Sequence, residues 1–227
     1  MPRTPLKDRT LPNYTRGNEI FNMVSHIVGA ALGIVALVTC VIMGALRGTV
    51  WSVVSGAIFG ASMILLYTIS SVYHGLKKPM AKKVMQVLDH CTIYLLIAGT
   101  YTPVTLVTIR SFDPAMGWVI FGVVWAAAIL GSVFTAIDFH KYRVLSYSCY
   151  FIMGWSVLVR IVPVMRALGR GGSVLLLSGG LFYMIGAVLY AIGANKKPSV
   201  HGIFHIFCLA GSLCHYLMVL FYIMPVT

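Results

Sequence analysis

The chain has 227 residues, of which 59% are hydrophobic and 10% are charged, and its formal net charge is +12. A mean hydropathy of +0.90 excludes a soluble globular domain, in which about a quarter of the residues are charged. The positive charge does not indicate a nucleic-acid-binding protein, because the basic residues form short clusters between apolar stretches and no continuous face. The composition is that of an integral membrane protein.

The polar N-terminus precedes every apolar run. Residues 1–19, MPRTPLKDRTLPNYTRGNE, contain three prolines and no apolar stretch, so they do not resemble a cleaved signal peptide. We expect a short cytoplasmic segment here. A single transmembrane domain is expected over residues 20–227.

Seven apolar stretches follow, each long enough for about 20 residues of helix across the bilayer. Short breaks with basic residues, Gly or Pro separate them. The expected spans are residues 20–46, 50–75, 85–108, 115–137, 144–165, 172–193 and 200–225. The sequence therefore predicts an all-α, seven-helix transmembrane bundle.

The basic residues predict the orientation of this bundle. Twelve of the 17 Lys and Arg residues lie in the N-terminus and in the breaks after the second, fourth and sixth spans, and five lie on the opposite side. The positive-inside rule then places the N-terminus in the cytoplasm and the C-terminus outside. We expect a multi-pass protein of the cell membrane.

Cysteines and glycines in the spans have structural interpretations. All five cysteines lie in apolar segments without a C-x-x-C pair, so we interpret them as small core residues. Gly29 with Gly33, and Gly56 with Gly60, have the four-residue spacing that lets neighbouring membrane helices approach closely.

Five polar residues are expected at one depth, one or two turns below the inner membrane surface. His74 ends the second span, Ser70 lies one turn deeper on the same face, and Asp89 begins the third span. His201 and His205 open the seventh span, which also starts at the cytoplasmic side. Charged and strongly polar side chains at membrane depth need a partner or a function.

The spacing of His201 and His205 predicts a metal site. Residues at i and i+4 share one helical face, so two imidazoles can bind one ion. His74 would complete three histidine ligands, the set that catalytic Zn²⁺ uses together with a water. Asp89 would contact that water or a ligand imidazole and accept a proton, and Ser70 would join this network or bind a substrate oxygen.

Simpler interpretations stay open for single residues. A histidine near a helix end is often an interfacial or hydrogen-bonded core residue, and Asp89 could pair with Lys82 or Lys83. His215 is too far along its helix for the same ion, so we expect it to hydrogen-bond within the bundle. His26 and His90 are expected to contact a ligand residue or lipid headgroups, and His140 is expected in a loop.

The stretches NEIFNMVSHIVGAALG, SSVYHGL, VLDHCTIYLLIAGTYTPVTL and HGIFHIFCLAGSLCHYLMVLFY resemble the hemolysin III family, the bacterial branch of the progestin and adiponectin receptor superfamily. The resemblance implies seven helices, a cytoplasmic N-terminus and zinc bound by His74, His201 and His205. It also implies that Asp89 faces the zinc-bound water, and that Ser70 belongs to a motif shared with alkaline ceramidases.

Three functions are compatible with these residues and this resemblance. The first is a zinc-dependent hydrolase of amide or ester bonds in membrane lipids, acting in membrane lipid and energetic homeostasis. The second is a non-enzymatic sensor of membrane properties with structural zinc. The third is the pore-forming, cytolytic activity that the family name implies; the few charges in the spans do not favour it. The expected partners are membrane lipids, including a lipid substrate.

Overall fold

Apolar helices make up almost all of the structure, a computed structural model that describes residues 4–139, 141–193, 197 and 199–225. Six helical stretches in this part of the chain are long and apolar enough to cross a membrane, and no strand occurs among the described residues. The prediction of an all-α, multi-pass membrane protein is confirmed.

The helical elements follow one another with short connections. In chain order they are η1 (Leu6–Asp8), α1 (Arg16–Arg47), α2 (Val50–Gly75), α3 (Pro79–Pro103), the π-helix η2 (Val104–Ile109), α4 (Arg110–Phe112), α5 (Pro114–Asp138), α6 (Arg143–Trp155), η3 (Ser156–Arg160), α7 (Ile161–Gly193), α8 (Ser199–Met218) and the π-helix η4 (Val219–Ile223).

Capping residues explain the first three breaks, which lie where the sequence predicts them. Thr49 and Ser52 cap α2 reciprocally, each side chain accepting the other's backbone amide. Pro79 and Pro114 occupy first helical positions, where the missing amide proton has no cost. Asp113 caps α5 by accepting the Met116 amide at 3.1 Å. These local signals fix where α2, α3 and α5 begin.

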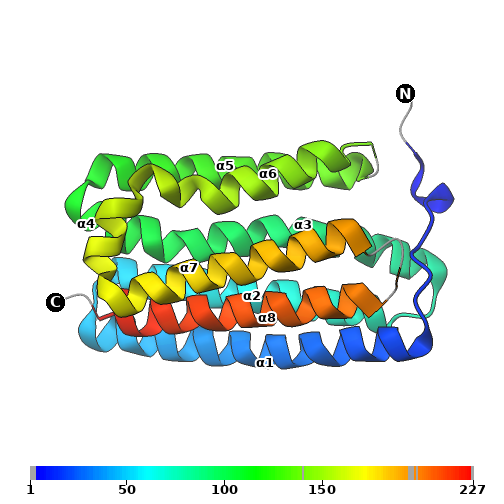
Figure 1. Ribbon diagram of the computed structural model, residues 1–227, viewed down its shortest axis with the longest axis horizontal. Coiled ribbons are helices and arrows are strands. Elements are labelled where there is room, and N and C mark those ends of the chain that lie inside the picture. The colour runs from blue at the N-terminus through cyan, green and yellow to red at the C-terminus, as the bar shows by residue number, and fades with distance from the viewer. Residues whose placement is uncertain (1–3, 140, 194–196, 198, 226–227) are drawn as a thin grey trace.

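The fifth apolar stretch, Arg143–Gly193, contains two predicted spans in one helical run of 51 residues. Gly169, at φ 64°, interrupts the regular geometry within the predicted break. Figure 1 shows α6 beside α5 and the long part of α7 beside α8, with the chain turning between them at the left. Because α6, η3 and α7 follow one another without a non-helical residue between them, they count as one candidate span.

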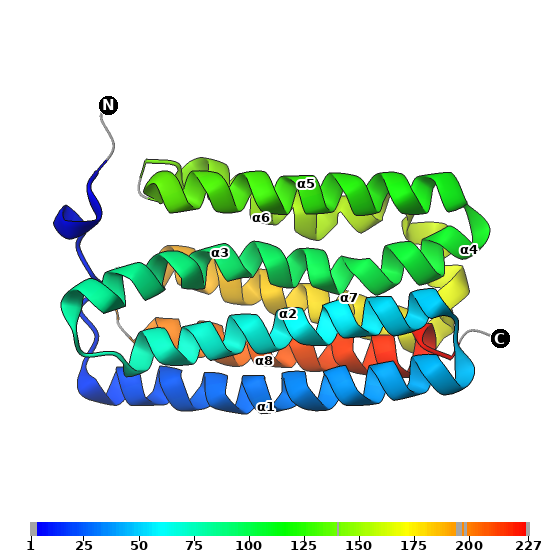
Figure 2. The same ribbon diagram turned by 180° about the vertical axis from the view of Figure 1, so that it is seen from behind.

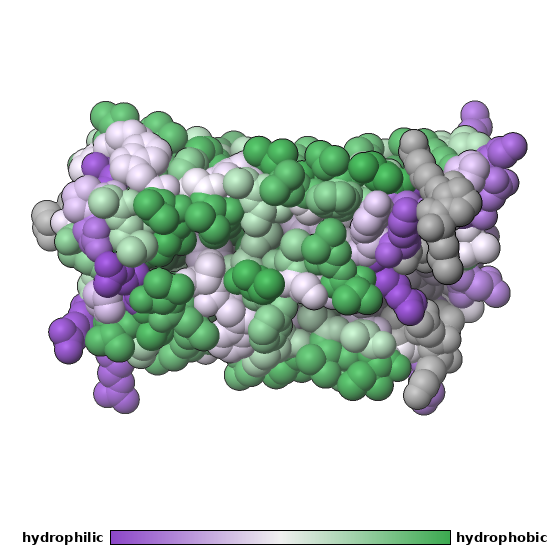
Figure 3. All heavy atoms as spheres, turned by 90° about the horizontal axis from the view of Figure 1, so that it is seen from above, coloured by the Kyte–Doolittle hydropathy of each residue, from purple (hydrophilic) through white to green (hydrophobic). Residues whose placement is uncertain are grey.

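The centre of the bundle is α3, as Figures 1 and 2 show. In the apolar window of Pro79–Phe112, 83% of residues are buried, against 11–50% in the other stretches. Figure 3 shows apolar side chains across the middle of one face and hydrophilic ones at both ends, as a bilayer requires.

Glycines let α1 and α2 pack closely, as the sequence predicts. A Cβ atom on Gly33 would lie 2.9 Å from the Ile64 amide nitrogen, and one on Gly60 would overlap the backbone of Leu37. All five cysteines are free. Cys40 and Cys208 are buried, as expected of core residues, whereas Cys91, Cys149 and Cys214 are only partly buried. The close contact holds α1 and α2 in register.

Candidate metal centre

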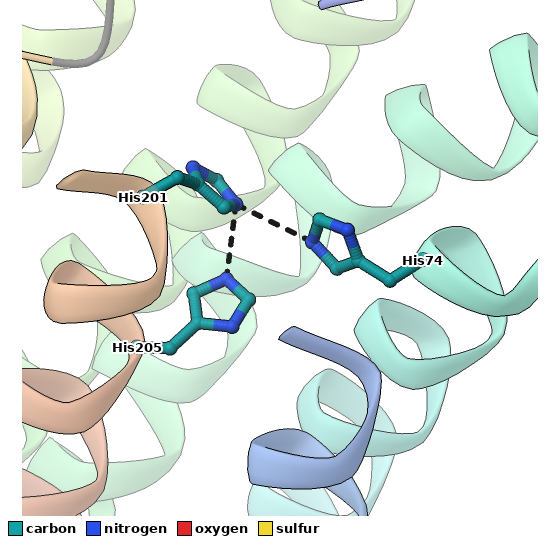
Figure 4. Close-up of side chains that lie close together, drawn as sticks. All are labelled: His74, His201 and His205. Atoms are coloured by element: carbon teal, nitrogen blue, oxygen red, sulfur yellow. Dashed lines mark hydrogen bonds between the residues drawn. The ribbon is translucent and has the colours of Figure 1, made fainter. Parts of the chain in front are cut away.

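Three imidazoles from two helices meet at the end of the bundle where α1 begins. His74 lies in the last turn of α2, and His201 and His205 lie in the first two turns of α8. The Nε2 atom of His201 is 3.3 Å from that of His74 and 3.0 Å from that of His205, as Figure 4 shows. All three residues are buried and could hold one metal ion.

Neighbouring groups assign the protons on two of these rings. His74 Nδ1 lies 2.6 Å from Glu19 Oε2, a carboxylate oxygen that can only accept a proton. His205 Nδ1 lies 3.4 Å from Ser25 Oγ, whose own proton goes to the Asn22 carbonyl at 2.9 Å. Both rings therefore carry their proton on Nδ1 when neutral. Their Nε2 lone pairs face His201, an arrangement that suits a cation between the rings.

Glu19 is the residue that sequence analysis missed. Its Oε1 atom lies 2.8 Å from Lys82 Nζ while Oε2 binds His74. Lys82 also donates to the carbonyls of Tyr73 and Leu76. One carboxylate thus joins α1, α2 and α3, and Lys82 balances its charge. The available signal was an acidic residue directly before the first predicted span, in a chain with five acidic residues.

His26 lies against the cluster. Its ring stacks on that of His205, with centroids 3.6 Å apart and planes at 14°. Asn22 lies one turn earlier on α1, and the side-chain nitrogen and oxygen atoms of both residues are buried without a hydrogen-bond partner in the described structure. His26 thus contacts a candidate ligand residue. This is one of the two surroundings predicted for it, the other being lipid headgroups.

The remaining histidines lie elsewhere. His215 hydrogen-bonds the Leu176 carbonyl at 3.2 Å, as expected within the bundle. His90 Nδ1 bonds the Gln86 carbonyl at 2.7 Å, and its ring packs on Phe139. His140 lies outside the described residues.

Asp89 is half-buried on α3 and is not one of the three candidate ligands. Its carboxylate lies within electrostatic range of the phenols of Tyr14, Tyr73 and Tyr190. The expected alternative partners are otherwise engaged, since Lys82 pairs with Glu19 and Lys83 donates to the Lys7 carbonyl. Within the described part of the chain, Asp89 forms no ion pair.

Three tyrosine rings pack against the cluster. Tyr73 lies 4.6 Å from His74, and Tyr190 lies 5.4 Å from His201, measured between ring centroids. Tyr14, just before α1, lies 5.1 Å from His201. Burial raises the pKa of the Tyr14 phenol above its usual range, so its hydroxyl group stays protonated. Asp89 and the candidate ligands thus share these aromatic neighbours.

Ser70 is buried on α2, one turn before His74. Among the described residues, its hydroxyl has no hydrogen bond that would assign it to the cluster. The predicted roles of Ser70 and Asp89 stay predictions.

The fold and this cluster define a class of protein: a multi-pass helical membrane protein with three buried histidines, from two helices, that could hold a metal ion. Comparison with known proteins then assigns the family. The chain belongs to the family described as Haemolysin-III related, whose profile matches residues 14–216. The resemblance noted from the sequence is confirmed.

Relatives match along most of their length. The chain is 40% identical to Hemolysin-3 of Bacillus cereus over 207 residues, which cover 91% of this chain and 92% of the relative. It is 37% identical to the Hemolysin-3 homolog of Bacillus subtilis over 213 residues, with 94% and 98% covered. Monocyte to macrophage differentiation factor of Homo sapiens is 26% identical over 206 residues, with 86% and 77% covered.

Proposed function

We propose that the protein is a zinc-dependent hydrolase that cleaves an amide or ester bond in a membrane lipid. The observation that carries this proposal is the convergence of three imidazole Nε2 atoms, two with their protons held on Nδ1 by Glu19 and Ser25. Three neutral imidazoles are a favoured zinc donor set and leave one position for a water.

Each residue then has a separate role. Zinc held by the three histidines would supply a Lewis acid and a water whose pKa falls toward about 7. Asp89 would accept the proton of the attacking water and pass it to the leaving amine or alcohol as the amide C–N or ester C–O bond breaks. Ser70, one turn deeper on α2, donates a hydrogen bond to the lipid carbonyl oxygen, and Glu19 fixes the orientation of His74. The lipid enters between helices, which accounts for hydrolytic residues at membrane depth.

The proposal includes seven membrane crossings, with α6 and α7 as the fifth and sixth. It is supported by the turn between these helices and by the positions of α1 and η4, since α1 begins at one end of the bundle and η4 ends at the other (Figure 1). The distribution of Lys and Arg supports a cytoplasmic N-terminus in the cell inner membrane.

Substitution of Asp89 tests the enzymatic role. Asp89→Ala is expected to abolish hydrolysis of lipid amides and esters by purified protein in lipid nanodiscs, because the proton acceptor is lost, while the zinc content stays at the wild-type value. Asp113→Ala, at the other end of the bundle, is the control and should keep full activity. Wild-type turnover in Asp89→Ala would refute the assigned role.

A structural zinc is the second candidate, and the burial of the histidines favours it. His74, His201 and His205 are only 3%, 8% and 2% exposed. In that case zinc removal would lower the thermal unfolding midpoint, and no lipid would be hydrolysed by the loaded protein. The names of two relatives, Hemolysin-3 and its homolog, make a pore-forming activity the third candidate.

A further inference from the structure

The chain before α1 forms a strap, Thr4–Thr15, across the end of the bundle that holds the three histidines. Figures 1 and 2 show it running from the end of α5, past α3, to the start of α1. Apart from the short helix η1, it has no regular secondary structure. Side-chain contacts must therefore hold it in place.

The first part of the strap is fixed to α5 by polar contacts. The Thr4 amide donates to Asp138 Oδ2 at 2.8 Å, and Arg9 Nη2 donates to the Ile137 carbonyl at 2.7 Å. Arg9 is 5% exposed and Asp138 is 1% exposed. Arginine is rarely buried to this degree unless specific partners compensate for its lost hydration.

The anchor also contacts α3 and borders an open pocket. Lys83 of α3 donates to the Lys7 carbonyl, but a cavity of about 140 Å³ remains beside the anchor. Its lining consists of Leu6, Arg9, Val84, Val87, Leu88 and Ala136. Three hydrogen bonds thus attach this part of the strap to α5 and α3, and the buried guanidinium of Arg9 makes the one in which a charged side chain donates to the end of α5.

The last part of the strap lies on the candidate metal centre. The Tyr14 ring is 5.1 Å from that of His201 and 5.9 Å from that of His74, between centroids. Thr15 then accepts the Asn18 amide at 3.2 Å and caps α1. The strap is thus held at both ends, with an aromatic ring over two of the three histidines.

We propose that this strap is a cover that closes the metal centre at its end of the bundle, and that release of the Arg9 anchor opens the centre to water. The proposal rests on the metal site proposed above. It assigns Arg9 a role in access to the histidines although Arg9 binds the end of α5 and is not in contact with them.

The rate of zinc release measures how readily water and solutes reach the metal centre. Full-length protein in nanodiscs, loaded with zinc, is mixed with a chromogenic chelator, and the rate of zinc transfer is followed. Arg9→Ala is expected to release zinc about tenfold faster. The lost hydrogen bond of a charged group stabilises the closed strap, and a bond of this kind changes an equilibrium by about a factor of ten or more. Arg16→Ala removes the same charge from an exposed site nearby and should release zinc at the wild-type rate.

A second measurement needs no metal. In protein stripped of zinc, labelling of His201 by diethyl pyrocarbonate is mapped by mass spectrometry. Arg9→Ala should label about tenfold faster than wild type, again by the loss of a charged hydrogen bond. Tyr14→Ala, which keeps the anchor and removes the covering ring, should also label faster, so a misfolded Arg9 variant does not leave the question open.

The outcomes separate the two proposals. The cover would be overturned if Arg9→Ala released zinc at the wild-type rate and His201 in Arg9→Ala and Tyr14→Ala were labelled at the wild-type rate. A wild-type protein that binds no zinc, with His201 still labelled faster in the variants, would overturn the metal site and leave the cover standing.

Discussion

Glu19 has the most specific contacts of the residues around the candidate metal centre, because its two carboxylate oxygens bind different helices. Oε2 holds the Nδ1 proton of His74, and Oε1 pairs with Lys82. Carboxylate partners of this kind orient a ligand imidazole and make it more basic. If the three histidines bind zinc as proposed, Glu19 would raise the metal affinity through His74 without touching the metal.

Glu19→Gln tests this effect while preserving size. The variant is expected to bind zinc about 10–100 times more weakly, since an amide supports the imidazole less than a carboxylate does. Competition titration with a chelator of known affinity measures the change. Asp113→Asn serves as the control, because Asp113 pairs with Arg160 at the other end of the bundle. Equal zinc affinity in wild type and Glu19→Gln would contradict the assignment.

At the residue scale, the sequence predicts the candidate ligands but not the residues that contact and orient them. His201 and His205 are four residues apart on one helix, and His74 follows from topology, so local spacing and charge counts bring them together. The contacts of Glu19, Ser25 and Tyr14 depend on how α1 packs against α2 and α8. Single-sequence periodicity does not specify that packing.

Helix starts with strong chemical signals lie at or near the predicted breaks, although α3 begins at Pro79 and the third span is predicted from residue 85. Thr49, Pro79 and Pro114 each begin a helix as their residue types favour. Between α6 and α7 the helical run continues through η3 and past Arg166 and Arg170, so the predicted ends at 165 and 172 do not appear as helix boundaries. The 3-10 helix η3 and the positive φ of Gly169 mark the change of direction.

Gly60 tests the packing of α1 on α2. Gly60→Ala is expected to destabilise the protein by about 1–3 kcal/mol, because the new methyl group would overlap the backbone of Leu37 and push the helices apart. Thermal unfolding in detergent measures the loss. On α5, Gly122 has no atom within 4 Å of an added Cβ, so Gly122→Ala should preserve stability or raise it by up to about 1 kcal/mol. Equal effects of the two substitutions would refute the close contact.

The whole molecule combines an apolar belt with a polar cluster placed towards one end. Hydropathy predicts the belt, and positive charge predicts which end faces the cytoplasm. The number of crossings depends on the stretch Arg143–Gly193. It is one of six apolar helical stretches, and if the chain turns back near Gly169 it crosses twice and the total is seven.

Reporter fusions test the number of crossings. Alkaline phosphatase fused after Thr227 is expected to be active, because seven crossings place this end outside, while a fusion after Lys197 should be inactive. Green fluorescent protein at the same two positions should give the opposite pattern. An inactive phosphatase after Thr227 would indicate an even number of crossings.

The central claim, that His74, His201 and His205 bind one zinc ion, is tested most directly by metal analysis of the purified protein. About one zinc per chain is expected in the wild type, and each single alanine variant should lose it, since three ligands are the smallest set that holds a catalytic zinc. His90→Ala, whose ring bonds the Gln86 carbonyl, should retain zinc. A wild-type protein without zinc, or alanine variants that keep it, would contradict the claim.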